Sequence, residues 1–154
     1  MSGLKIGESK VIESRETQDG TMIRRRRVSL DGKYRFTTYE RIERPGMMVR
    51  KRSGSKEAFD REKLANAVRN SVGKYFESDL DVQNVVSKVE DAIYALGKDE
   101  IQSKVIGEKI LEVLSETNDM AYVRFVSVFR EFKTLDELEQ SIAEQRARML
   151  ARKK

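Results

Sequence analysis

The stretch "MIRRRRVSLDGKYRFTTYER", residues 22–41, decides how the first part of this chain folds. An extended segment that carries four arginines runs into Asp31-Gly32, and a second extended segment follows. Asp-Gly is typical of tight turns because glycine adopts positive φ without steric cost. A second such pair, Asp19-Gly20, precedes the stretch, and residues 9–15 before it are β-like. Three extended segments joined by two tight turns predict an antiparallel meander over residues 1–45.

The rest of the chain has a helical pattern. The dipeptide Pro45-Gly46, which holds the only proline, marks a boundary. A small hairpin turning at Ser53-Gly54 is expected next, and then a helix that begins near Asp60. Four stripes of apolar residues recur at helical spacing: Leu64, Val68, Val72 and Tyr75; Val82, Val85, Val86, Val89, Ile93 and Leu96; Ile106, Ile110, Val113 and Leu114; Tyr122, Phe125, Val126, Phe129 and Phe132. Each stripe predicts one buried helix face.

A fifth helix is expected at the C-terminus. "TLDE", residues 134–137, fits a capping box, in which Thr134 accepts from an unpaired N–H and Glu137 reaches back. The residues expected to face inward are Leu135, Leu138, Ile142 and Met149, with "RARMLARKK" trailing into solvent. The predicted fold class is therefore α+β, a small β meander followed by a mainly helical part with a short hairpin. The expected divisions are residues 1–45, 46–136 and 137–154.

Composition excludes several classes of protein. The chain has 154 residues and contains no cysteine and no histidine. Disulfides, thiolate metal sites, cysteine nucleophiles and the commonest general base are thereby excluded. No stretch approaches ~18 uninterrupted apolar residues, and the N-terminus lacks the apolar core of a signal peptide. A cytoplasmic binding protein is expected.

Charge is distributed unevenly along the chain. Residues 1–56 hold 15 basic and 7 acidic side chains, residues 57–143 hold 11 and 18, and residues 144–154 hold 5 and 1. An acidic middle thus lies between basic ends, which indicates an anionic partner that is met at particular places.

The arginine run is the first of these places. On an alternating strand, Arg24 and Arg26 face one side and Arg25 and Arg27 face the other. Guanidinium groups bind phosphates and also read guanine edges, so nucleic-acid contact is one interpretation. A solvated edge strand that resists aggregation is the other. The run alone does not separate DNA from RNA or from a membrane surface.

The second basic place is "VRKRSGSKEAFDREKL", residues 49–64. Cationic side chains on a hairpin, together with the positive end of the following helix, would hold phosphates well. An ordinary basic hairpin is the alternative. The P-loop pattern is missing.

Five segments, in this order and spacing, resemble the NrdR family of bacterial transcriptional repressors of ribonucleotide reductase genes: "KVIESR", "RRRR", "RFTTYER", "VRKRSGSKEAFDREKL" and "AYVRFVSVFREFKTLDEL". The resemblance covers nearly the whole chain. It implies an N-terminal zinc ribbon that binds an operator in double-stranded DNA, joined to an ATP-cone that binds ATP or dATP. It also implies a homo-oligomer whose size, and whose affinity for paired operator boxes, changes with the bound nucleotide. Such a protein is expected not to be an enzyme and to have no membrane partner.

The resemblance, with the basic pattern around the first strands, gives two sets of candidate residues. The DNA-binding candidates are Arg15, Arg24, Arg25, Arg26, Arg27, Lys33 and Arg35. The nucleotide-binding candidates are Val49, Lys51, Arg52, Glu57, Lys63, Ser103, Tyr122, Phe129 and Lys133. Two positions depart from the family: Ser53 stands where an aspartate often precedes the glycine, and Phe129 replaces a common tyrosine.

The largest departure is the absence of all four zinc ligands. The family's ribbon has two CxxC pairs; the second falls on Ser29 and Gly32, and the first would fall within "MSGLKIG". A zinc knuckle needs thiolate or imidazole ligands, so no metal is predicted. The meander is expected to fold by its Asp-Gly turns, by docking on the ATP-cone and by a small core, whose candidates are Val11, Ile12, Met22, Ile23, Val28, Tyr34, Phe36, Tyr39 and Ile42.

Two other functions remain open. One is a nucleotide-binding regulator that has lost specific DNA recognition with its zinc and acts through protein contacts. The other is a structural protein that uses its basic ends for unspecific adhesion to nucleic acid.

Overall fold

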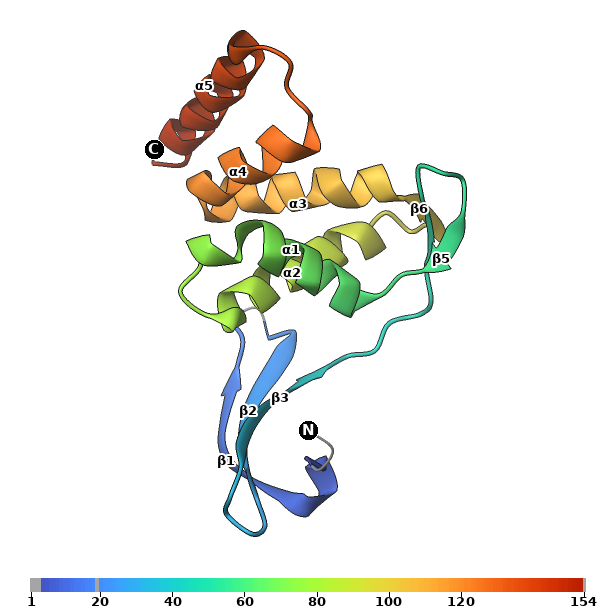
Figure 1. The fold of residues 1–154 in the computed structure, drawn as a ribbon, viewed down its shortest axis with the longest axis vertical. Helices are drawn as coiled ribbons and strands as arrows, with labels where there is room; N and C mark the ends of the chain where they lie inside the picture. Colours follow the sequence, from blue (N-terminus) through green and yellow to red (C-terminus); the bar gives the residue numbers. More distant parts are fainter. Residues whose placement is uncertain (1–3, 19, 154) are drawn as a thin grey trace. The chain divides into compact units, whose positions relative to one another are not determined.

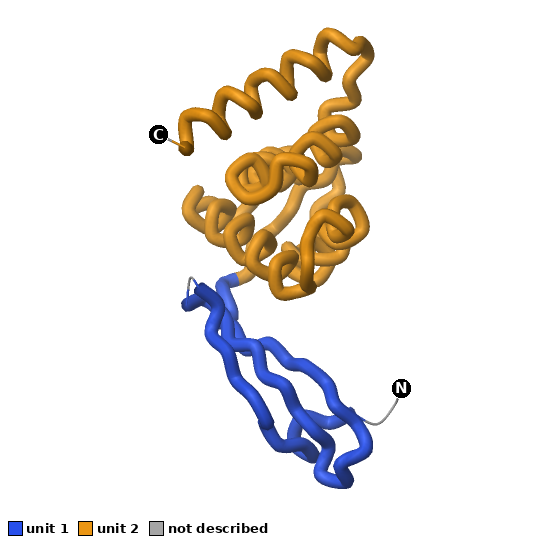
Figure 2. Tube along the Cα trace, turned by 90° about the vertical axis from the view of Figure 1, so that its left-hand side faces the viewer, with its two compact units in different colours: residues 1–45 blue, residues 46–154 orange. Residues whose placement is uncertain are grey.

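The computed structural model describes residues 4–18 and 20–153, and within them an antiparallel three-stranded sheet is followed by five α-helices and a small mixed sheet. The predicted α+β class is confirmed. The chain divides into two units, residues 1–45 and residues 46–154, which Figure 2 shows in different colours. The first is the N-terminal unit and the second is the C-terminal unit.

The N-terminal unit is the predicted meander. Its strands are β1 (Ser9–Glu16), β2 (Met22–Ser29) and β3 (Arg35–Arg41), paired in the order β1-β2-β3, with a short 3-10 turn, η1 (Ile6–Glu8), before them (Figure 1). Gly20 and Gly32 have φ of 68° and 75°, in the left-handed region where glycine is favoured. The two tight turns therefore use their glycines as expected, although Asp19 of the first turn lies outside the described residues.

The predicted core of this unit is largely wrong. Val11, Ile12, Tyr34 and Ile42 are exposed, Ile42 to 80% of its surface. Met22 is buried, and the remaining candidates, Ile23, Val28, Phe36 and Tyr39, are half-buried. The reason is that one sheet has two faces, and the described residues of this unit supply no second layer to cover either of them.

A hairpin opens the C-terminal unit, as predicted. Strands β4 (Met48–Arg50) and β5 (Lys56–Ala58) pair antiparallel, and Gly54 in their turn has φ of 88°. A third strand, β6 (Glu100–Gln102), pairs parallel to β4. Strand β6 was not expected, because three residues are too short to show a period. The Glu100 carboxylate binds Arg50 at 2.6 Å and Lys56 at 2.8 Å, so one side chain joins all three strands.

Four of the five helices, α1 to α4, pack around one apolar cluster. The five helices are α1 (Arg61–Val72), α2 (Asp79–Tyr94), α3 (Ser103–Thr117), α4 (Asp119–Phe129) and α5 (Leu135–Arg152), with a 3-10 turn, η2 (Gly73–Tyr75), after α1. The predicted stripes supply most of the buried cluster. Leu96 is an exception: α2 ends at Tyr94, so Leu96 lies beyond the helix and is exposed.

A buried arginine joins the first two helices. The Arg61 guanidinium on α1 lies 3.0 Å from the Glu90 carboxylate, and it also donates to Gln83 at 2.6 Å and to Ser87 at 3.0 Å. A buried charge is tolerated only when it is paired and hydrogen-bonded. These contacts fix the first turn of α1, the turn that carries Lys63.

The last helix differs from its prediction. Leu135 is 76% exposed, Leu138, Ile142 and Met149 are half-buried, and the buried side chains are Ser141 and Gln145. The Gln145 amide donates to the Ser115 carbonyl and to Asp119, both at 2.7 Å, so α5 is held largely by polar contacts. The expected tail is helical as far as Arg152.

The cap of α5 is half of the predicted box. Thr134 accepts from the Glu137 N–H, but the Glu137 carboxylate accepts from the N–H of Lys133 instead of that of Thr134.

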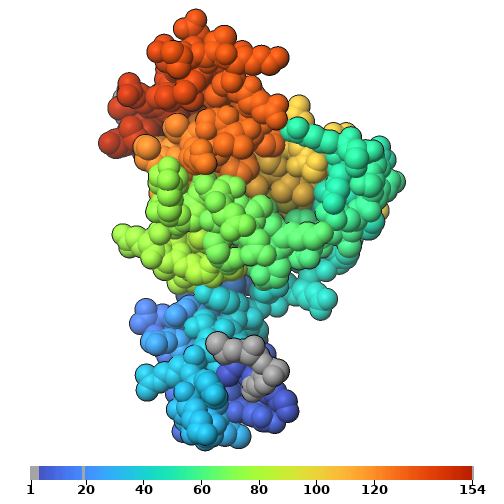
Figure 3. Space-filling model, in the orientation of Figure 1, coloured from blue at the N-terminus to red at the C-terminus, as the bar shows by residue number. Residues whose placement is uncertain are grey.

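In the space-filling view, the atoms of α5 (red) lie against those of α4 (orange) within the C-terminal unit (Figure 3).

Candidate functional site

One face of the three-stranded sheet is strongly cationic. The strand registers place six basic residues on it: Lys10, Arg15, Arg24, Arg26, Arg35 and Arg41. Among the described strand positions of this face, Glu13 is the only carboxylate. It binds Arg15 at 2.6 Å and Arg26 at 3.6 Å. Arg24, Arg35 and Arg41 form no ion pair with other described residues. We call this set the cationic face.

The opposite face holds its arginines in internal contacts. Arg25 binds the Glu40 carboxylate at 2.9 Å, and Arg27 donates to the hydroxyls of Thr38 at 3.0 Å and Ser9 at 3.2 Å. The four consecutive arginines are therefore two different pairs. Lys33 lies in the exposed β2–β3 turn, outside both faces.

The β2–β3 turn contains Ser29 and Gly32, where the resemblance places the family's second cysteine pair. The Asp31 carboxylate accepts from the Ser29 hydroxyl and from the Lys33 N–H, and the same hydroxyl accepts from the Tyr34 N–H at 3.0 Å. The hydrogen bond from Ser29, followed by that from Lys33, holds the pKa of Asp31 below its usual value. The carboxylate thus closes the turn in its charged form.

These residues do not fit a zinc ion. Ser29 and Gly32 offer neither thiolate nor imidazole, and the Asp31 carboxylate is already used by hydrogen bonds. In the described part of the chain, no cluster of three or more acidic, cysteine or histidine side chains is placed to hold a metal ion.

Three nucleotide-binding candidates meet beside the hairpin. Glu57 on β5 accepts from Lys63 of α1 at 3.0 Å and from Lys51, just after β4, at 3.1 Å. The hydrogen bonds from Lys63 and then Lys51 lower the pKa of Glu57. Val49 is buried in β4 between Glu57 and Ile101. The carboxylate therefore orients two ammonium groups side by side on an exposed surface.

Three further candidates line a cavity of about 740 Å³ in the same unit. Arg52 comes from the hairpin turn, Phe129 from the end of α4 and Lys133 from the segment before α5. The other charged residues of the lining are Lys104, Glu108, Arg130, Glu131, Glu137 and Glu144. The lining thus holds four cations and four carboxylates. We call this cavity the hairpin pocket.

The helix end that is open to an anion belongs to α3, not to α1. Asp60 caps α1 by accepting from the N–H groups of Glu62 and Lys63, which contradicts the expectation that this end would bind phosphate. Ser103 is the first residue of α3, and the preceding Gln102 side chain makes no capping bond. Lys104, in the same turn, lines the hairpin pocket.

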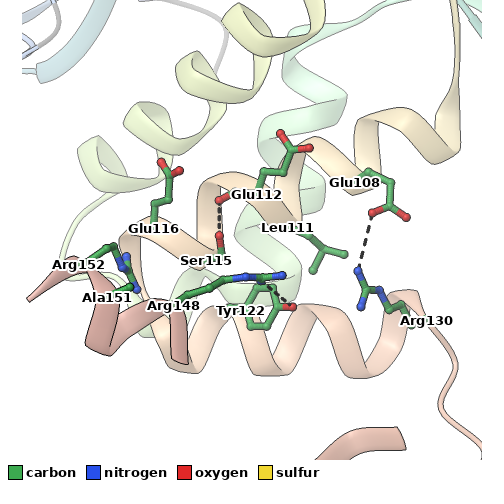
Figure 4. Close-up of a pocket in the computed structure, with 10 residues that line it drawn as sticks. All are labelled: Glu108, Leu111, Glu112, Ser115, Glu116, Tyr122, Arg130, Arg148, Ala151 and Arg152. Atoms are coloured by element: carbon green, nitrogen blue, oxygen red, sulfur yellow. Dashed lines mark hydrogen bonds and ion pairs between the residues drawn. The ribbon is translucent and has the colours of Figure 1, made fainter. Parts of the chain in front are cut away.

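Tyr122 lies apart from the other candidates. Its ring is buried in α4 and its hydroxyl accepts from Arg148 of α5 at 3.4 Å. It lines a second cavity, of about 560 Å³, between α3, α4 and α5. Figure 4 shows Arg148 lying over the Tyr122 ring, with Glu108, Glu112 and Glu116 along one side of α3.

Sequence reasoning missed Lys104 and Arg130 in the hairpin pocket. Lys104 directly follows a predicted site residue, so the position of Ser103 at a helix start was a usable signal. Arg130 offered none, because its place in the pocket depends on how α4 ends against α3.

No helix in the described ranges, residues 4–18 and 20–153, is long and apolar enough to cross a membrane.

Comparisons with known proteins agree with this two-part organisation. Residues 5–40 match the model of the transcriptional repressor NrdR-like N-terminal domain, and residues 47–135 match the ATP cone domain. The chain is 46% identical over 132 residues to transcriptional repressor NrdR of Streptococcus suis. The alignment covers 86% of this chain and 81% of that protein.

Two further relatives carry the same name. Transcriptional repressor NrdR of Streptococcus equi subsp. zooepidemicus is 39% identical over 147 residues, and that of Streptococcus pyogenes is 37% identical over the same length. Each alignment covers 96% of this chain and 90% of the relative. The chain therefore belongs to the NrdR family of transcriptional repressors.

Proposed function

We propose that this chain is a nucleotide-responsive repressor of ribonucleotide reductase genes that acts by binding, not by catalysis. Residues 1–45 bind an operator in double-stranded DNA, residues 46–136 bind ATP or dATP, and residues 137–154 form a C-terminal helix with a basic end. Because its proposed partner is operator DNA, we expect the protein in the cytoplasm, which contains the bacterial chromosome. The observation that carries the proposal is the cationic face, with six basic side chains against one carboxylate.

The two pairs of arginines have different roles in this proposal. Arg24 and Arg26, on the cationic face, contact phosphates together with Arg15 and Arg35. Arg25 and Arg27 were also candidates for DNA binding, but here we assign them to the sheet, because their guanidinium groups are bound to Glu40 and to two hydroxyls. Lys33 in the turn adds a contact beside the face.

The nucleotide site combines the lysine pair at Glu57 with the hairpin pocket. Lys51 and Lys63 are oriented by one carboxylate, and ammonium groups held in this way bind the triphosphate. Arg52 and Lys133 complete the polar lining, and Phe129 gives an apolar surface. Ser103 starts α3 next to Lys104 of the lining and contributes from the helix end. Val49 fixes the hairpin from beneath, while Tyr122 supports α4 from the second cavity.

Nucleotide binding regulates DNA binding by changing assembly. A ligand shifts an equilibrium only by its difference in affinity for the two states. We therefore expect ATP and dATP to stabilise homo-oligomers of different size, and one of these to present two cationic faces to paired operator boxes. Gel filtration with ATP, with dATP and without nucleotide tests this step.

The DNA role is tested by two matched double variants. Arg24→Gln with Arg26→Gln should weaken binding to duplex DNA from upstream of ribonucleotide reductase genes. It should also reduce the slope of log K against log salt by about 0.9 for each phosphate that the variant no longer neutralises. Arg25→Gln with Arg27→Gln removes the same charge from the other face and should leave that slope unchanged.

A random duplex of the same length separates the alternatives. Specific binding requires tighter binding to the upstream duplex. Equal affinity for both duplexes would indicate unspecific adhesion, and no binding to either would indicate a regulator that acts through protein contacts. Equal slopes for the two double variants would refute the assignment of the cationic face.

A further inference from the structure

Gly107 lies in the interior of α3, one turn after Ser103, and is buried. Glycine is the least favourable residue in a helix interior after proline, because it loses the most backbone entropy and packs no side chain. Its φ is not in the left-handed region, so the backbone does not require it. The reason for a glycine here must therefore be space.

The space is taken by Phe129. A Cβ atom placed on Gly107 would lie 2.1 Å from Cε2, 2.5 Å from Cζ and 2.9 Å from Cδ2 of the Phe129 ring. No real Cβ atom approaches another side chain that closely, so any side chain at position 107 would force the ring to move. One edge of the ring thus rests directly on the backbone of α3.

A second ring also contacts Phe129. Phe125, one turn earlier on α4, stacks on it with centroids 5.7 Å apart and an interplanar angle of 20°. Just beyond Phe129 the backbone leaves the helix, and Glu131 has φ of 49°. Because α4 ends at Phe129, no later turn of this helix holds the ring. The position of the Phe129 ring therefore depends on its contacts with Gly107 and Phe125.

This ring is part of the lining of the hairpin pocket, with Arg52 from the hairpin and Lys104 from α3. We propose that Gly107 is a positioning residue for nucleotide binding: its missing side chain seats the Phe129 ring against α3, and this gives the pocket its shape. The inference rests on the proposed nucleotide site. It adds a residue that has no polar group and that the binding candidates do not include.

The test measures ATP and dATP affinity by calorimetry for the full chain and four variants: Gly107→Ala, Phe129→Leu, the double variant Gly107→Ala with Phe129→Leu, and Gly46→Ala. The last is the matched control, because a Cβ on Gly46 meets nothing within 4 Å and its φ is not in the left-handed region. Melting temperatures are recorded for all of them.

Gly107→Ala should weaken the binding of ATP and of dATP by at least about fivefold. This factor is the low end of the free-energy cost of overpacking, expressed as a change in an equilibrium constant. In the Phe129→Leu background, the same change should alter affinity by less than about twofold. It should also raise the melting temperature there, because alanine favours the helix once the ring edge is gone. Gly46→Ala should match the wild type in affinity.

The outcomes separate this inference from the proposed function. A wild-type chain that binds no nucleotide refutes the proposed site, and with it the role of Gly107. A wild type that binds, with Gly107→Ala binding equally well, refutes the inference alone. If Gly107→Ala fails to fold but the double variant folds, the result supports the proposal that Gly107 positions the Phe129 ring. If both fail to fold, or if the two changes are additive, Gly107 does not act through Phe129.

Discussion

In the C-terminal unit, nineteen apolar side chains are buried in one cluster formed by the hairpin and the helices. In the N-terminal unit, Met22 is the only fully buried apolar side chain among the described residues. The sheet is held instead by cross-strand pairs, by glycines at positive φ and by the hydrogen bonds around Asp31.

The difference shows two ways to hold a binding surface. Packing of a buried cluster places residues from distant segments, such as Arg52 and Lys133, around one cavity. A sheet needs no cluster to place a row of charges, because strand alternation alone sends every second side chain to the same face. A cationic face of this kind can be built with little apolar burial, and the hairpin pocket cannot.

The largest expected effect comes from a matched pair of leucines. Leu114→Ala removes a fully buried side chain of α3 and should lower the free energy of unfolding by about 2–5 kcal/mol. Leu30→Ala, in the β2–β3 turn where the side chain is 70% exposed, should change it by less than about 0.5 kcal/mol. Urea unfolding followed by circular dichroism measures both, and similar losses would remove the contrast between the units.

Nucleotide binding should depend on the C-terminal unit at single residues. Lys63→Ala should weaken ATP and dATP binding by about 1.5–3 kcal/mol, since it removes a charged hydrogen-bond donor to phosphate. Stability should hardly change, because the Lys63–Glu57 pair is a surface ion pair. Lys88→Ala, an exposed lysine of α2, is the control for calorimetry. Unchanged affinity in Lys63→Ala would exclude Lys63 from the site.

A smaller effect is expected from pH in the N-terminal unit. The folded-state pKa of Asp31 is lowered, so its contribution is present above the unfolded-state pKa, near 3.8, and is lost as pH falls through the folded-state value. Amide exchange at Lys33 and Tyr34, followed by NMR, should therefore be slower in the wild type than in Asp31→Asn at pH 6. The two chains should become alike well below pH 3.8. A difference that persists there would mean that charge is not what closes the turn.

No effect at all is expected from a chelator. Because no zinc ligands stand at Ser29 and Gly32, EDTA should leave the melting curve and the affinity for DNA unchanged, and elemental analysis should find no stoichiometric zinc. A lower melting temperature in EDTA would contradict the interpretation that hydrogen bonds, and not a metal ion, hold the β2–β3 turn.

Much of this protein was readable from local sequence. Asp31-Gly32 and Ser53-Gly54 marked turns because glycine's backbone freedom is a property of one residue. The helices were visible because burial repeats with the helical period, as in Val82, Val86 and Val89. The alternation of Arg24 to Arg27 between two faces follows from strand geometry alone, and the absence of the zinc ligands follows from composition.

Tertiary structure decided what depends on residues far apart in the chain. Which arginines are engaged was set by cross-strand neighbours, as when Glu40 binds Arg25. Strand β6 exists because β4 offers it a partner, and α5 docks through Gln145 because Ser115 and Asp119 accept from it. Gly107 acquires its meaning only when Phe129 lies against it. The physical reason is that turn and period signals are local energies, whereas ion pairing and side-chain packing depend on which surfaces the folded chain brings together.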